Sequence, residues 1–262
     1  MNDNIIKEIF WVATVLLAYA FAGYPIFITL LAKCFPAPAL RDDGTYTPLV
    51  TVILVAHNEE TRMSERIRNL LDTSYPGERL TVLIVSDGST DRTGLTASES
   101  GDPRVTVLEA ASQTGKSASL NMAIPQARGD IVVLADARQC FDRSTIPALV
   151  APFADRKVGA VSGALEIAPS AESAGAGIGA YWKLEKQVRL NESRFDSCIG
   201  CTGAIYAIRK NLYKPVPEDT IVEDVVIPMR IAFAGFRVVF APKARAFDPM
   251  PQDPRKERIR KP

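Results

Sequence analysis

Residues 80–91 read L-T-V-L-I-V-S-D-G-S-T-D and carry the clearest fold signal in the chain. Five of the first six residues are apolar, which predicts a strand buried on both faces, and the turn residues after Val85 end it abruptly. Asp87 is then a carboxylate at the carboxyl end of a strand, the edge at which open α/β sheets bind ligands. Because an ionised carboxylate only accepts hydrogen bonds, Asp87 suits an N–H donor such as the imide of uracil.

The residues after Asp87 fit the same interpretation. Gly88 would leave room for a ligand, and Ser89 or Thr90 would cap the following helix. A strand, a tight turn and a helix cap with no ligand would produce the same letters, so the stretch needs support from elsewhere.

Length and charge limit the class of protein. A chain of 262 residues holds one large α/β domain or two small ones, and a net charge of +1 gives no drive toward nucleic acid, so no nucleic-acid partner is expected. The four cysteines are too few and too irregularly spaced for a disulfide framework, which indicates a reducing compartment. Cys198 and Cys201 have redox or zinc spacing, but no second pair exists, and ordinary packing is the competing interpretation.

The N-terminus contains a long apolar run. Residues 9–32 carry no charge over 24 positions, and about 20 residues suffice for a helix to cross the hydrocarbon core. We therefore expect a single-pass anchor over 1–35, with Trp11 and Tyr24 near the interfaces and a kink at Pro25, followed by a linker over 36–48. A cleaved signal peptide is the alternative, although its apolar core is usually shorter.

The rest of the chain alternates between strands and helices. Strands are predicted at 49–56, 80–85, 105–108 and 131–135, with helices between them, and this order predicts a doubly wound, mainly parallel α/β sheet. Its ligand edge would carry His57, Asp87 and Asp136. Farther along we expect a loop at 175–179, a helix over 181–191, a helix from about 220 to 234 and a closing pair of strands within 236–247.

Two acidic strand ends suggest a nucleotide whose phosphates share a metal with the protein. Lys116 follows Gly115 at a predicted helix N-terminus, where backbone N–H groups and a cation both favour phosphate. A Walker loop is excluded because that motif requires glycine where the chain has Ala110.

From Val50 to about Asp248 the chain resembles the family 2 glycosyltransferases, inverting enzymes of the GT-A fold that include cellulose, chitin and hyaluronan synthases. The resemblance rests on motifs in the family's order: Ala56-His57-Asn58-Glu59, Asp87-Gly88-Ser89-Thr90-Asp91, Gly115-Lys116 with Leu120-Asn121, Asp136, Gly200 to Arg209, and Val222-Glu223-Asp224. It implies a GT-A domain over 49–248 that moves a sugar from a nucleotide-diphosphate sugar, UDP-sugar by preference, to a saccharide or lipid-linked acceptor. Such enzymes serve cell-surface polysaccharide or glycolipid synthesis, here at a bacterial inner membrane with the domain in the cytosol.

The resemblance also implies roles for individual residues. Asp224 would be the catalytic base and Glu223 its companion, although acids at a helix start are also common as caps. Asp136 would hold Mg²⁺ or Mn²⁺ as the first acid of a D-x-D metal site. The acceptor side would be formed by Cys201, Thr202 and Gly203. The nucleotide would be bound by Ala56, His57, Asn58, Glu59, Asp87, Gly88, Lys116 and Asp136.

One position departs from the family pattern and opens alternatives. Arg138 stands where the D-x-D motif has its second acid, and a cation there would repel a metal or touch the phosphates. A nucleotide-sugar-binding partner subunit with little or no turnover is therefore a second hypothesis, and a nucleotidyltransferase is a third. The basic tail, residues 249–262, would lie on anionic lipid or form the stub of a phosphate-closing lid in a shortened family member.

Overall fold

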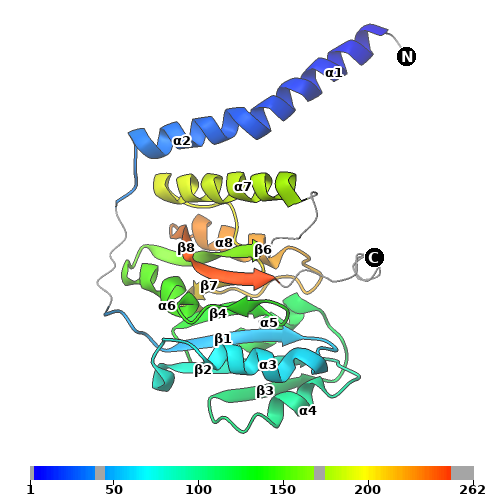
Figure 1. The fold of residues 1–262 in the computed structure, drawn as a ribbon, viewed down its shortest axis with the longest axis vertical. Coiled ribbons are helices and arrows are strands. Elements are labelled where there is room, and N and C mark those ends of the chain that lie inside the picture. Colours follow the sequence, from blue (N-terminus) through cyan, green and yellow to red (C-terminus); the bar gives the residue numbers. More distant parts are fainter. Residues whose placement is uncertain (1–2, 39–44, 168–174, 249–262) are drawn as a thin grey trace.

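The computed structural model describes residues 3–38, 45–167 and 175–248, so the predicted basic tail lies outside the described residues. Within that part, eight strands form one sheet in the order β3-β2-β1-β4-β7-β6-β8-β5 (Figure 1). The strands are β1 (Val50–Ala56), β2 (Leu80–Asp87), β3 (Val105–Ala110), β4 (Ile131–Asp136), β5 (Cys140–Phe141), β6 (Val158–Ile167), β7 (Ile205–Arg209) and β8 (Arg237–Asp248).

The four strands predicted from apolar runs form the parallel half of the sheet. β1 lies between β2 and β4, and β3 pairs with the outer side of β2, all in parallel. Ala56 is in register with Ser86, and Val55 with Asp136, so these strands end at the same edge. The prediction of a mainly parallel α/β sheet is confirmed.

The other half of the sheet is mixed. β7 is antiparallel to β4 and β6, whereas β6 and β8 are parallel, and the two-residue β5 closes the edge against β8. The predicted closing pair of strands is wrong, because residues 237–248 form one long strand that follows β6 with two register shifts.

Helices cover both faces of the sheet. They are α3 (Glu60–Leu71), α4 (Thr93–Ser98), α5 (Lys116–Ala123), α6 (Thr145–Val150), α7 (Gly175–Phe195) and α8 (Glu223–Phe233), with short 3-10 turns at 77–79, 124–126, 151–154 and 210–212. Alternate residues of β1 enter different cores: Leu54 packs with Leu70 of α3, and Ile53 packs with Leu120 of α5. The expected loop at 175–179 is instead part of the first turns of α7, which runs unbroken to Phe195.

The N-terminal helix stands apart from the sheet. It comprises α1 (Asp3–Ala18), a π-helical segment η1 (Tyr19–Gly23) and α2 (Tyr24–Cys34), and α2 lies along α7 while α1 projects beyond the domain (Figure 1). Residues 4–34 are long and apolar enough to cross a membrane. Pro25 has no N–H to donate to Phe21, and the backbone N–H of Tyr24 bonds Tyr19 instead, so the proline is accommodated by a π turn and the helix continues.

Candidate active site

The carboxyl ends of the parallel strands border an open cleft of about 430 Å³. The cleft is lined by the carboxyl end of β4, the first residue of α5, the loop before β7, and the start of α8 with the residues just before it. The lining residues are Lys116, Asp136, Gly203, Ala204, Thr220, Ile221, Glu223 and Asp224. Five residues predicted from sequence for separate roles therefore meet in one place: Lys116, Asp136, Gly203, Glu223 and Asp224.

Lys116 is the centre of this arrangement. Its ammonium lies 2.9 Å from Asp136 Oδ1 and 2.8 Å from Glu223 Oε1, and it also donates to the carbonyl of Gly203 at 3.4 Å. Burial lowers the pKa of Lys116, but the two carboxylates outweigh it and hold the pKa above its ordinary value. The cleft therefore contains a fixed positive charge between two acids.

Asp224 is half-buried at the start of α8. Burial, and then the neighbouring charge of Glu223, raise the pKa of its carboxyl, although Lys116 and the N–H of Gly203 act in the opposite direction. A carboxylate with a raised pKa is a stronger proton acceptor, which is the property that a general base needs.

A proline four residues later ties the acceptor-side loop to Asp224. Pro228 has no N–H and cannot make the usual α-helical bond to the carbonyl of Asp224, and the N–H of Cys201 donates to that carbonyl at 2.9 Å. Gly203 packs directly against the carboxylate of Asp224: a Cβ at position 203 would lie 2.6 Å from Asp224 Oδ2. The 201–203 loop and the carboxylate are thus held together by backbone contacts.

The end of β4 is supported by a residue that the sequence interpretation missed. Arg66 of α3 is buried, lies 4.3 Å from the ring centre of Phe141, and donates from Nε to the carbonyl of Asp136. Within the α3 sequence it is one of several arginines, and no local signal marks it out.

Asp87 lies at the end of β2 as predicted, but its oxygens already have partners. Oδ1 accepts from the N–H and hydroxyl of Thr114, and Oδ2 accepts from the N–H of Gly115, at 2.8–2.9 Å. Burial raises the pKa of Asp87, yet these hydrogen bonds outweigh it and hold the pKa below the ordinary value. Asp87 is an ionised acceptor that fixes the loop leading into Lys116.

The loop beside Gly88 also differs from the expectation. Gly88 has φ +59°, and a Cβ there would lie 2.1 Å from the backbone N of Gln113. The space predicted for a ligand is therefore taken by the chain itself, and glycine is needed for that close approach.

The Ala56 to Glu59 segment is joined to the loop that follows β2. Ala56 is the last residue of β1, and His57 Nδ1 lies 2.7 Å from the carbonyl of Asp87. Asn58 Oδ1 accepts from the N–H of Thr90, while the N–H of Glu59 donates to Thr93.

Neither residue predicted to cap α4 does so: the N-cap residue is Arg92, and it makes no side-chain cap hydrogen bond. The carboxylate of Asp91, rather than Ser89 or Thr90, accepts from the N–H of Thr93 at the start of α4. Ser89 and Thr90 instead bond Asn58 across the two loops. The contact with Asn58, a residue distant in sequence, therefore gives Ser89 and Thr90 a different role from the one predicted.

The three residues predicted for the acceptor side have different surroundings. Cys201 is buried in the core and burial raises its pKa, so it does not line the cleft. Thr202 is held by Arg189 of α7, whose guanidinium donates to its hydroxyl at 3.0 Å, and only Gly203 reaches the cleft. Arg189 is the second supporting residue that the sequence interpretation missed.

Cys198 and Cys201 do not form a disulfide in the structure. Both thiols are free and buried, and burial raises the pKa of Cys198 to about 12. Both side chains belong to one buried hydrophobic cluster, together with Tyr206 and Ile227, which supports the packing interpretation.

Arg138 was expected to repel a metal or to touch the phosphates, but in the structure it is paired with another residue. Its guanidinium makes a two-pronged ion pair with Asp248 at the end of β8, at 3.0 and 2.7 Å. Its charge is thereby compensated by a residue distant in sequence, which weakens the argument that it repels a metal.

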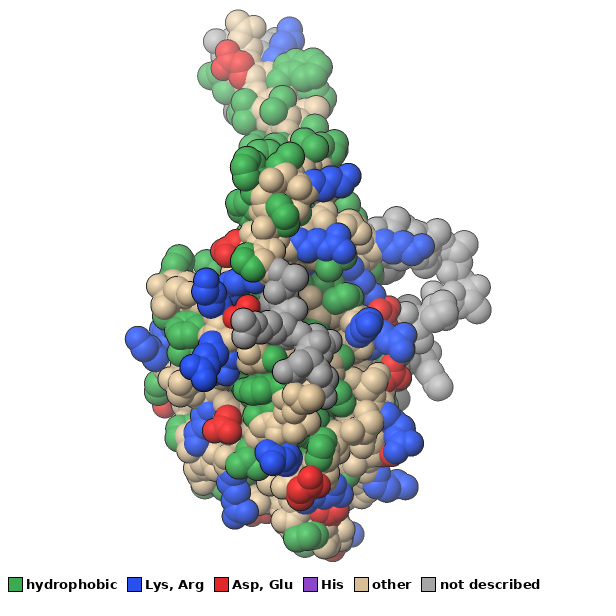
Figure 2. Space-filling model, turned by 90° about the vertical axis from the view of Figure 1, so that its left-hand side faces the viewer, with side chains coloured by type: hydrophobic (Ala, Val, Ile, Leu, Met, Phe, Trp, Pro, Cys, Tyr) green, Lys and Arg blue, Asp and Glu red, His purple; other side chains and the backbone are tan. Residues whose placement is uncertain are grey.

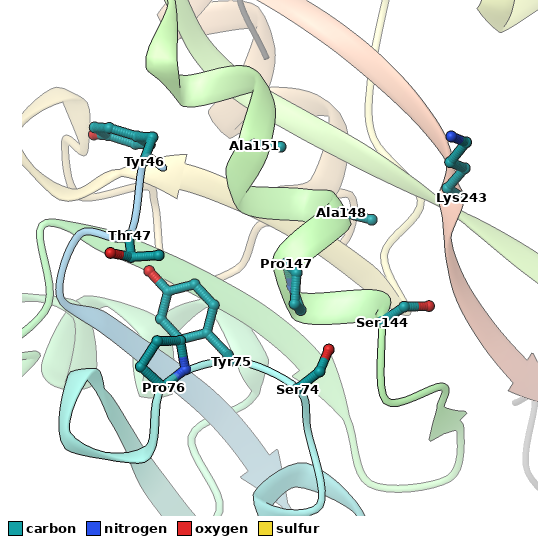
Figure 3. Close-up of a pocket in the computed structure, with 10 residues that line it drawn as sticks. All are labelled: Tyr46, Thr47, Ser74, Tyr75, Pro76, Ser144, Pro147, Ala148, Ala151 and Lys243. Atoms are coloured by element: carbon teal, nitrogen blue, oxygen red, sulfur yellow. The ribbon is translucent and has the colours of Figure 1, made fainter. Parts of the chain in front are cut away.

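A larger cavity of about 480 Å³ lies on the other side of the sheet, near the amino ends of the strands. Figure 3 shows Tyr75 and Pro76, just before β2, facing Pro147 and Ala148 of α6, with Lys243 at the rim. Its lining contains no carboxylate and none of the predicted site residues. A third cavity of about 520 Å³ is lined by Asp130, Arg209 and Lys210, and it too contains none of the predicted site residues.

Comparisons with known proteins identify the family. The family model described as "Glycosyl transferase family 2" matches residues 51–216. The "Probable glycosyltransferase YdaM" of Bacillus subtilis is 24% identical over 82% of this chain and 54% of its own length. The "Beta-monoglucosyldiacylglycerol synthase" of Nostoc is 32% identical over 48% of this chain and 28% of its own. The chain therefore spans about half or less of these curated relatives.

Solved structures show the same fold. A mannosyltransferase from Pyrobaculum calidifontis, in complex with GDP-Man and Mn²⁺, superposes with a TM-score of 0.78 at 28% identity over 94% of this chain and 70% of its own. Staphylococcus aureus TarS 1–349 with UDP-GlcNAc superposes at 0.61 with 18% identity, over 78% of this chain and 59% of its own, and shows the fold alone. With the family model covering most of the chain and the motif residues meeting in one cleft, the chain belongs to glycosyl transferase family 2.

Proposed function

We propose that this protein transfers a sugar from a nucleotide-diphosphate sugar to an acceptor hydroxyl with inversion, in cell-surface polysaccharide or glycolipid synthesis. The observation that carries the proposal is the cleft in which Lys116 lies between Asp136 and Glu223, with Asp224 beside them. This arrangement offers a cationic and metal-binding side for a diphosphate and a carboxylate for the acceptor. Glycolipid and polysaccharide synthases among the similar proteins support this class of product.

The donor would lie along the loops at the ends of β1, β2 and β4. Uridine is our preferred base because the ionised Asp87 accepts hydrogen bonds, although it must share its oxygens with Thr114 and Gly115. The Pyrobaculum structure holds GDP-Man and the TarS structure holds UDP-GlcNAc, so a donor panel should include both bases.

The residues fit a divalent cation that arrives with the donor. Asp136 opens onto the cleft with 38% of its side chain exposed, and Mg²⁺ is commonly held by one or two carboxylates together with substrate phosphates. The Mn²⁺ in the Pyrobaculum structure supports this proposal. When bound, Mg²⁺ or Mn²⁺ would neutralise charge that develops on the departing diphosphate.

The chain's own groups would carry the remaining steps. Asp224 accepts the proton of the acceptor hydroxyl, and the hydroxyl oxygen forms a bond to the anomeric carbon of the sugar. The bond between that carbon and the diphosphate breaks at the same time. Lys116 stays protonated and contributes positive charge near the phosphates. The ion pair with Glu223 holds the ammonium of Lys116 in place. The products are the glycosylated acceptor and a nucleoside diphosphate.

The organisation of the chain follows the same proposal. Residues 1–35 would anchor the protein as a single pass in a bacterial inner membrane, 36–48 would be the linker, and 49–248 the catalytic domain on the cytosolic side. The free cysteines support a reducing compartment for the domain. The acceptor would be a saccharide or a lipid-linked molecule.

A thermal-shift screen of nucleotide sugars on the full chain in detergent, with and without Mn²⁺, tests donor binding. A ligand at 100 times its dissociation constant stabilises by about 2.7 kcal/mol. Donor turnover is then measured in the parent and in Asp224→Asn, with Asp219→Asn, an exposed acid outside the cleft lining, as the matched control.

We expect Asp224→Asn to bind donor normally and to lose transfer by about 10²–10⁴-fold, with Asp219→Asn unchanged. Transfer by Asp224→Asn within threefold of the parent would remove Asp224 from the mechanism. Donor binding without turnover in the parent would favour the partner-subunit alternative, and release of diphosphate rather than a nucleoside diphosphate would identify a nucleotidyltransferase.

A further inference from the structure

The two halves of the N-terminal helix have different surroundings. Large apolar side chains of α1 are exposed on every side, with Phe10, Trp11 and Val15 each at least 60% exposed. In α2, Ile28 and Ala32 are buried against the domain, whereas Ile26, Phe27 and Leu30 are more than half exposed. Figure 2 shows hydrophobic side chains gathered along the helical column that rises from the domain.

Polar contacts fix α2 to α7. The hydroxyl of Tyr24 donates to Glu192 at 2.5 Å, and the amide of Asn191 donates to Thr29 at 2.7 Å. Just beyond α2, the N–H of Ala37 donates to the carbonyl of Arg194 at 2.7 Å. The second half of the apolar helix is therefore part of the domain.

α7 is too highly charged to enter hydrocarbon. Within residues 183–194, Lys186 forms an ion pair with Glu166, and Arg189 forms an ion pair with Glu185 and donates to the hydroxyl of Thr202. Ionised side chains inside a bilayer are rare and costly. Because α2 packs against this charged helix, we infer that α2 also lies outside the hydrocarbon core.

The free part of the helix has the length of a membrane span. α1 and η1 together comprise residues 3–23, and 21 residues at about 1.5 Å each give about 31 Å, close to the roughly 30 Å of the hydrocarbon core. Lys7 lies about 6 Å from the start of α1, where a lysine side chain reaches the headgroups, and Glu8, one residue deeper, is the acid that this interval brings into the hydrocarbon. Tyr19 and Tyr24, with ring centres 6.4 Å apart, lie where an aromatic interface belt is expected.

We propose that the bilayer boundary lies at Tyr19–Tyr24, so that residues 3–23 enter the lipid and α2 remains outside, fixed to α7. The partner of the exposed α1 surface is the lipid bilayer. This replaces the interval 9–32 expected from hydropathy, and it moves Trp11 from the interface to the interior of the membrane. The proposal concerns the position of the helix and does not depend on the catalytic activity.

The two intervals predict different depths for the same residues. With residues 3–23 in the bilayer the midpoint is residue 13, which places Trp11 about 3 Å, Phe21 about 12 Å and Leu30 about 25 Å from the centre. With residues 9–32 the midpoint lies between 20 and 21, so Phe21 is at the centre and Trp11 and Leu30 each lie about 14 Å away.

Tryptophan quenching in vesicles separates these cases. The chain has two tryptophans, so Trp182→Phe leaves Trp11 alone, and Phe21→Trp or Leu30→Trp in a Trp11→Phe, Trp182→Phe background moves the probe. Phe21 and Leu30 are more than half exposed, so these variants should fold. The full chain is reconstituted in phosphatidylcholine vesicles that carry a nitroxide either near the acyl-chain end or near the headgroup.

We expect Trp11 to lose more fluorescence with the deep nitroxide, and the probe at 30 to lose more with the shallow one or to be unquenched. The probe at 21 should lie between them. Deepest quenching at position 21 would overturn the proposal in favour of the hydropathy interval. Shallow quenching at both 11 and 21 would overturn it in favour of a helix lying in the membrane surface.

Discussion

Replacing Lys116 by methionine should destabilise the protein strongly, because it leaves a buried acid without its partner. Glu223 has 6% of its side chain exposed and lies 2.8 Å from the ammonium of Lys116. Breaking a buried ion pair costs about 3–5 kcal/mol, and since the Lys116 side chain is 31% exposed we take the lower end, about 3 kcal/mol.

Thermal unfolding of the full chain in detergent, followed by circular dichroism, measures this cost. For a chain of this size 1 kcal/mol corresponds to roughly 2–4 °C, so the midpoint should fall by about 6–12 °C. Adding Glu223→Gln to Lys116→Met removes the uncompensated charge and should recover at least about 1.5 kcal/mol.

Lys186→Met is the matched control. Lys186 is paired with Glu166 at 2.6 Å and is about as exposed as Lys116, but its acid is 35% exposed. Its replacement should cost no more than about 1 kcal/mol. Equal midpoint shifts for Lys116→Met and Lys186→Met would refute the claim that the burial of Glu223 makes the first pair important.

Four further predictions concern Asp224, Gly203 and Gly88. Because burial raises the pKa of Asp224, the transfer rate should fall, as pH is lowered, at a pH above the ordinary carboxylate range near 4. A raised folded-state pKa also means that stability is lost as pH rises through it, so Asp224→Asn should unfold at a higher temperature than the parent at pH 8 and equally at pH 3, as calorimetry would show. Gly203→Ala should fold normally but displace Asp224, with kcat reduced by about 10²-fold in a donor-turnover assay, and unchanged kcat would contradict the 2.6 Å contact. Gly88→Ala should cost more than about 2 kcal/mol in denaturant unfolding, since its Cβ would meet the backbone of Gln113 at a positive φ, and a loss below 0.5 kcal/mol would contradict that packing.

The parallel half of the fold could be predicted because each strand is a short segment rich in apolar and β-branched residues. Parallel strands share their carboxyl edge, so Asp87 and Asp136 were placed on the same edge without any knowledge of contacts. β6 was not predicted because Gly159 and Gly163 interrupt its pattern. Gly163 is required there by β8, since a Cβ would lie 2.8 Å from the carbonyl of Ala244.

The supporting residues of the site could not be predicted for a different reason. Arg66, Arg189 and Asp248 act on Asp136, Thr202 and Arg138 through contacts between segments far apart in sequence. Each is an ordinary charged residue in its own segment. The roles of Ser89, Thr90 and Gly88 were predicted wrongly for the same reason, because each of them contacts a second loop that is distant in sequence.

The bond between Tyr24 and Glu192 joins residues 168 positions apart, and this has a consequence for the order of events during synthesis. At roughly 5–20 residues per second, about 8–34 s pass between the appearance of the two partners. Until then the whole apolar helix is free to enter the membrane as one segment. Completion of α7 then gives Tyr24 and Thr29 their partners, so folding of the domain would draw α2 out of the lipid and set the final depth of the anchor.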